Sequence, residues 1–94
     1  MQNLTIENVL ERVKSQHGLK SDYMVGKVLN IRQTTVSNWR TGRSFPDEKM
    51  CLILAQAASI DPAFLVASMQ AQRTKDDEVR AIWEQVAERL QHMH

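Results

Sequence analysis

Cysteine, glycine, proline and aromatic residues are all scarce in this 94-residue sequence, and each scarcity excludes a class of protein. A single cysteine, Cys51, excludes an internal disulfide framework, and its apolar neighbours Met50 and Leu52 predict a buried, unreactive thiol. With 3 Gly and 2 Pro beside 43% hydrophobic residues, the composition is neither collagen-like nor typical of a disordered chain. The sequence therefore predicts one globular domain with a thin core.

Long apolar runs and clustered reactive side chains are missing as well. No stretch approaches the length needed to span a bilayer, and the amino end lacks the basic flank and apolar core of a secretory signal. We therefore expect a cytoplasmic protein without membrane contact. No Gly-rich phosphate loop and no Ser/His/Asp set is present, and the three histidines are dispersed. The sequence thus predicts no enzyme, no metal site and no cofactor.

Charge is nearly balanced overall, at +1, but it is unevenly distributed along the chain. Residues 1–46 hold seven Lys/Arg and three acids, a net charge of +4. Residues 47–94 hold five bases and eight acids, a net charge of −3. The basic half is the expected nucleic-acid surface, with a chance asymmetry of a solvated surface as the alternative.

Apolar residues recur at helical spacing and no segment alternates as a strand does, so the sequence predicts an all-α fold. Every expected helix except the third follows a capping residue, namely Thr5, Ser21, Asp47, Asp61 and Thr74, and Gly18, Asn30 and Gly42 are expected to end the first three helices. The expected helices cover residues 6–16, 21–29 and 33–41, with further helices from 47, from 62 and from 74 to 92. The expected inward residues are Ile6, Val9, Leu10, Val13, Val25, Val28, Leu29, Val36, Trp39, Met50, Ile53, Leu54, Ala57, Leu65 and Met69.

Residues 21–42 have the pattern of a helix-turn-helix. A supporting helix over 21–29 is followed by the short turn 30–32 and by a second helix over 33–41. The second helix has small polar residues on its outer face and apolar residues on its inner face. Gly26 is unusual inside a helix, and a close approach of the next helix would explain it. Such a second helix fits the major groove of DNA, so we name residues 33–41 the reading helix.

The string VSNWRTGRSFP and the segment from Ile60 to Leu65 make the chain similar to the Cro/C1-type helix-turn-helix family of phage repressors and bacterial relatives. The likeness covers about residues 4–67. It implies a five-helix, lambda-repressor-like DNA-binding domain over 4–69, with an extra amphipathic helix over 74–92. It also implies a sequence-specific transcriptional regulator of double-stranded DNA, either a dimeric phage or prophage repressor or a Cro-like protein.

The same resemblance implies the residues that meet DNA. Base contacts are expected from Gln33, Thr34, Thr35, Ser37 and Asn38. Backbone contacts are expected from Arg43, which matches a basic position of the family, and, apart from the resemblance, from Tyr23, Lys27, Arg32 and Arg40. Chemically, Gln33 and Asn38 can each bond bidentately to adenine, and a threonine methyl can pack on thymine.

Three positions depart from the family pattern. Asp22 stands where relatives often place a phosphate-binding Gln, and a carboxylate there is expected to repel a phosphate. Arg32 replaces a Ser or Thr cap, which adds a charge near the DNA backbone. Arg40 replaces a Glu that relatives pair with an Arg of the first helix. That inner ion pair is therefore expected to be absent, leaving Arg40 for a phosphate or for an acid such as Glu11.

The last helix carries an apolar stripe formed by Val79, Ile82, Trp83, Val86 and Leu90. The stripe can pack on its own domain or pair with a second copy, and we favour a homodimer because such proteins usually read two half-sites about 34 Å apart. An alternative function is an antitoxin-type module whose last helix binds a partner protein and which can also bind its own promoter.

Overall fold

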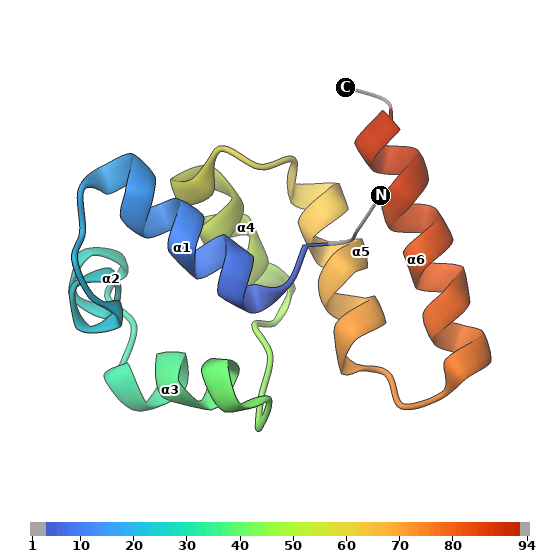
Figure 1. Cartoon of the computed structure of the whole chain (residues 1–94), viewed down its shortest axis with the longest axis horizontal. Helices are drawn as coiled ribbons and strands as arrows, with labels where there is room; N and C mark the ends of the chain where they lie inside the picture. The colour runs from blue at the N-terminus through green and yellow to red at the C-terminus, as the bar shows by residue number, and fades with distance from the viewer. Residues whose placement is uncertain (1–3, 93–94) are drawn as a thin grey trace.

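The computed structural model describes residues 4–92, which fold into six helices joined by short loops, without a strand in that range (Figure 1). The predicted all-α class is therefore confirmed. The helices are α1 (Ile6–His17), α2 (Asp22–Leu29), α3 (Gln33–Thr41), α4 (Glu48–Ala58), α5 (Pro62–Arg73) and α6 (Asp77–His92). Among the described residues, no helix has the length and apolar character needed to cross a membrane.

The helix ends are set by local capping. At the starts of α1, α2, α4 and α5 a side-chain oxygen accepts a hydrogen bond from the N–H three residues ahead, which satisfies a donor that the helix itself leaves free. These N-caps are Thr5, Ser21, Asp47 and Asp61. At the C-termini of α1 to α4, Gly18, Asn30, Gly42 and Ser59 adopt the left-handed conformation that ends a helix. All of these positions except Ser59 were predicted from the sequence.

The main core lies among α1 to α5. The predicted apolar face of α1 is confirmed, since Ile6, Val9, Leu10 and Val13 are fully buried. The reading helix α3 contributes Val36 and Trp39, of which Trp39 keeps only 3% of its surface exposed. Cys51 is also buried there, and burial raises the pKa of its thiol to about 11, so it stays a neutral thiol near neutral pH.

A second, smaller cluster joins α6 to α5. Its buried members are Phe64, Ala67 and Ala87, and the partly buried side chains packed against it include Trp83, Val86 and Leu90. Most of the predicted stripe of α6 therefore packs back on its own chain. Val79 and Ile82 do not, because they remain 39% and 59% exposed.

Two predicted helix faces are wrong in part. Val28 is 55% exposed, because α2 turns only one narrow side toward the core and Val25 occupies it. Helix α4 buries Cys51 and Leu54 fully, whereas Met50 is only partly buried. When a short helix has apolar residues on adjacent faces, the sequence pattern does not fix which face is buried. The packing of the neighbouring helices decides it.

The connection between α5 and α6 also differs from the prediction. Helix α5 continues through Arg73, although the sequence from residue 70 is polar. Thr74 follows α5 as its C-cap, and the N–H groups of Glu78 and Val79 bond to the Asp76 carboxylate instead. Asp76 therefore takes the capping role that the sequence assigned to Thr74, since it lies next to the first helical residue.

Gly26 is required by the turn of the helix-turn-helix. A Cβ atom at this position would lie 2.6 Å from the carbonyl oxygen of Ile31, which is backbone and cannot swing aside. The close approach is thus to the turn rather than to the next helix. We expect Gly26→Ala to lower the free energy of unfolding by about 1–3 kcal/mol, measured by urea denaturation, despite the better helix propensity of alanine. Unchanged stability would contradict the tight contact.

Candidate nucleic-acid interface

The reading helix α3 presents a polar face to solvent along one edge of the molecule (Figure 1). Gln33, Thr34 and Ser37 are exposed on it. Asn38, one turn after Thr34, is partly buried, and so is Thr35, which lies nearer the packed side. Because Val36 and Trp39 anchor the opposite side, α3 displays short polar side chains on a fixed apolar base.

A groove of about 520 Å³ opens at the amino end of α3. Its lining includes Tyr23 and Lys27 from α2 and Arg32 and Gln33 from the start of α3. The Lys27 ammonium lies 5.5 Å from the centre of the Tyr23 ring, which holds both side chains on this side of α2. Arg32 is the N-cap residue and its side chain makes no cap hydrogen bond. The N–H groups at the start of α3 and the cationic side chains of Lys27 and Arg32 therefore lie close together. Such an environment is suited to an anion.

Two exposed arginines bracket the reading helix. Arg32 precedes α3, and Arg43 follows it in the loop after Gly42. Neither forms an ion pair with any residue in the range 4–92. Nine helical residues span about 13 Å, close to the roughly 12 Å width of the major groove. An exposed arginine without an ion pair in this range thus stands at each end of α3.

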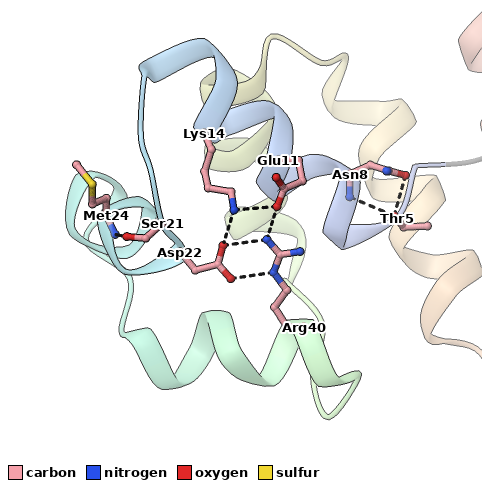
Figure 2. Close-up of polar contacts among 8 residues, drawn as sticks. All are labelled: Thr5, Asn8, Glu11, Lys14, Ser21, Asp22, Met24 and Arg40. Atoms are coloured by element: carbon pink, nitrogen blue, oxygen red, sulfur yellow. Dashed lines mark hydrogen bonds and ion pairs between the residues drawn. The ribbon is translucent and has the colours of Figure 1, made fainter.

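A closed ring of ion pairs joins the first three helices (Figure 2). Arg40 of α3 donates from Nε and Nη2 to both carboxylate oxygens of Asp22 on α2, at 2.8 and 2.9 Å. Its Nη2 also lies 2.7 Å from Oε2 of Glu11 on α1. Lys14 Nζ closes the ring, at 2.8 Å from Glu11 Oε2 and 3.3 Å from Asp22 Oδ1. We call these four residues the ion-pair ring.

The ring shifts the protonation equilibria of its members. The Arg40 hydrogen bonds lower the pKa of Asp22, against an opposing effect of burial. Hydrogen bonds from Lys14 and then Arg40 lower the pKa of Glu11. The pKa of Arg40 is raised, chiefly by Asp22, and that of Lys14 chiefly by Glu11. All four groups are therefore charged near neutral pH.

Two expectations about this region are corrected by the ring. The inner ion pair between the first helix and the reading helix is present, with its charges reversed: Glu11 lies on α1 and Arg40 on α3. Arg40 was expected to meet either a phosphate or an acid such as Glu11. The structure shows the contact with Glu11, and it adds a bidentate contact with Asp22. The Asp22 carboxylate is thereby neutralised by two cations, so it does not act as an isolated negative charge.

The ring makes a prediction for the pH dependence of stability. The folded pKa of Asp22 lies below its ordinary value, so its stabilising contribution is complete above that ordinary value and is lost as pH falls through the folded pKa. We expect Asp22→Asn to lower the melting temperature by a few degrees at about pH 7 and to have little effect near pH 2. Thermal unfolding of both proteins across this range is the measurement. A difference that is independent of pH would contradict the ring.

Sequence reasoning missed two residues of this region. Lys14 was not singled out, although its i,i+3 spacing from Glu11 is that of a helical ion pair. Thr41 is exposed at the end of α3, four residues after Ser37 on the same face, and its hydroxyl donates to the Asn38 carbonyl. The other predicted contact residues lie on or beside α3, with Tyr23 and Lys27 exposed on the neighbouring α2.

The geometry of α3 and its surroundings carries the functional argument by itself. Comparison with models of protein families, with curated proteins and with solved structures found no match for this chain. What the interface binds therefore has to be inferred from its shape, its charge and the chemistry of its side chains.

Proposed function

We propose that the chain is a sequence-specific regulator of transcription that inserts α3 into the major groove of double-stranded DNA. In this proposal α1 to α5 form a lambda-repressor-like DNA-binding domain. One observation carries the proposal: α3 exposes Gln33, Thr34 and Ser37 while its other side is anchored by the buried Trp39. The size of these side chains and the exposed arginines at both ends of α3 support the proposal, since a polar outer face by itself is common to surface helices.

Each part of the interface has a role in this proposal. Gln33 and Asn38 carry amide groups that match the donor and acceptor of adenine in the major groove, and Thr34 offers a methyl group to thymine. Arg32 and Arg43 meet phosphates, which fix the register of the protein on the duplex without reading its sequence. The groove between Lys27 and the start of α3 would receive a further phosphate.

A homodimer is part of the same proposal, since one reading helix buries little surface and seldom binds tightly. Val79 and Ile82 leave an apolar flank on α6 that residues 4–92 cover only in part. In Figure 1, α3 runs across the lower edge while α6 runs upward at the opposite end of the molecule. A twofold axis parallel to α6 would place both reading helices on one side, as two half-sites require.

Selection of duplexes from a random pool, repeated at two salt concentrations, tests the proposal. We expect enrichment of one palindromic sequence, and a linear fall of log affinity with log salt whose slope reports the phosphates contacted. Sedimentation of the pure chain with and without the selected duplex gives the stoichiometry. If no duplex is enriched, or if binding is independent of sequence at both salt concentrations, the proposed function is wrong.

The apolar flank of α6 also supports a second candidate, an antitoxin-type module that binds a partner protein. Its exposed Val79 and Ile82 lie in the acidic half of the chain, which suits a basic partner. This candidate predicts that a small basic protein copurifies with the chain, whereas the first candidate needs no protein partner other than a second copy. Copurification of such a protein therefore favours the second candidate.

A further inference from the structure

We infer that Arg40 is a positioning residue: through the ion-pair ring it sets the rotation of α3, and it does not itself bind a DNA phosphate. The effect on DNA recognition rests on the proposed function, whereas the effect on the orientation of α3 does not. The inference starts from the distances within the ring and from the small number of apolar anchors on α3.

The ring is the polar attachment between the reading helix and the two helices behind it. Arg40 lies in the last turn of α3 and bonds to acids on two different helices, α2 and α1. The bidentate contact with Asp22 fixes the plane of the guanidinium group as well as its distance. Lys14 bonds to the same two acids from the other side and therefore holds them in place for Arg40.

The apolar contacts of α3 are few, so a polar contact such as the ion-pair ring can contribute to its orientation. Only two of its nine residues, Val36 and Trp39, are buried. These anchors lie about 60° apart around the helix, so they hold α3 on one narrow side and leave part of its rotation to other contacts. Arg40 lies about 40° from Val36 and about 100° from Trp39, and adds a polar attachment on the flank next to Val36. Base recognition tolerates an error of only about 10–20° in the orientation of a contacting side chain.

Positive and negative charges alternate around the ion-pair ring. Each cation contacts both acids and each acid contacts both cations, so the net charge of the four residues is zero. Two of the guanidinium nitrogens are already used within the ring. Phosphate contacts at the ends of α3 are left to Arg32 and Arg43, which are exposed.

Replacement of Arg40 by Met and by Lys tests the inference. Arg40→Met keeps an unbranched side chain without the charge, and Arg40→Lys restores the charge without the bidentate geometry. The matched control is Arg80→Met, since Arg80 also joins separate segments, through Asp77 and the Thr74 carbonyl, but lies at the start of α6. If Arg40→Met fails to fold, Asp22→Asn probes the same bidentate contact with an isosteric change.

Three quantities are measured on each protein: the affinity ratio for the selected duplex over a mixed-sequence duplex, the salt slope, and amide residual dipolar couplings without DNA. For Arg40→Met we expect the ratio to fall by about tenfold, with the salt slope unchanged. The couplings of α3 should change relative to those of α1, α4 and α5. Arg40→Lys should recover part of both effects, and Arg80→Met should show neither.

The outcomes separate the alternatives. A salt slope reduced by about one in Arg40→Met, with unchanged couplings, would identify Arg40 as a phosphate contact and overturn the inference. Unchanged couplings together with an unchanged affinity ratio would also overturn it. If the wild-type chain enriches no duplex, the proposed function fails, and the couplings of α3 alone decide whether the ring orients the helix.

Discussion

Replacing Gln33 and Asn38 together by alanine is expected to remove most of the preference for the selected duplex while leaving the fold intact. Both amides lie on the polar side of α3, one turn and a half apart, and neither side chain fills the core. Each well-formed bidentate pair contributes about 1–3 kcal/mol of discrimination, so losing two should cost at least about thirtyfold in relative affinity. Titration of the selected and mixed-sequence duplexes at one salt concentration measures this ratio.

The matched control changes two amides elsewhere on the surface. Gln56 on α4 and Gln85 on α6 are exposed, and their replacement by alanine alters size and polarity in the same way. We expect this control to keep the full preference. The reading role of α3 is wrong if the Gln33/Asn38 variant retains its discrimination, or if the control loses as much.

Trp39→Ala is expected to have the largest effect on stability of any substitution in the reading helix. The Trp39 indole is almost completely buried and is one of the two anchors of α3. Truncating a buried tryptophan typically costs about 3–5 kcal/mol, which corresponds to a fall in melting temperature of more than about 15 °C for a domain of this size. Calorimetry of the wild type and the variant provides the comparison.

The second tryptophan is the natural control. Trp83 packs against the cluster between α5 and α6 but is only partly buried. We expect Trp83→Ala to cost less than half as much as Trp39→Ala, because part of its surface meets water in the folded state. Equal losses would show that α6 contributes to the main core more than its packing suggests.

Most helix boundaries, apart from those between α5 and α6, were predictable because they are local. A capping side chain bonds to the backbone three residues ahead, so Ser21, Asp47 and Asp61 identify a helix start from a few neighbouring residues. The left-handed ends at Gly18 and Gly42 follow from the backbone freedom of glycine. These signals need no knowledge of the rest of the chain. The exposed polar side of α3 was predictable for the same reason, since it depends on helical spacing alone.

The rotation of α2 and α4 and the ion-pair ring were not predictable in this way. Whether Val28 or Val25 of α2 faces inward depends on where α1 and α3 lie, and the sequence offers both as apolar residues. The ring joins residues separated by up to 29 positions, so its partners meet only in the folded chain. Glu11 was one of the two partners expected for Arg40, but the participation of Asp22 and Lys14 follows from tertiary packing.

The attachment of α6 has a consequence for how such a protein can diverge. Its cluster with α5 is small and consists mainly of alanine-sized and half-covered side chains. Substitutions on the outward flank of α6 therefore do not disturb Val36 and Trp39, the two buried residues of α3. Under the proposed function, substitutions on the outward flank of α6 can therefore change a protein partner while the DNA sequence recognised by α3 stays the same.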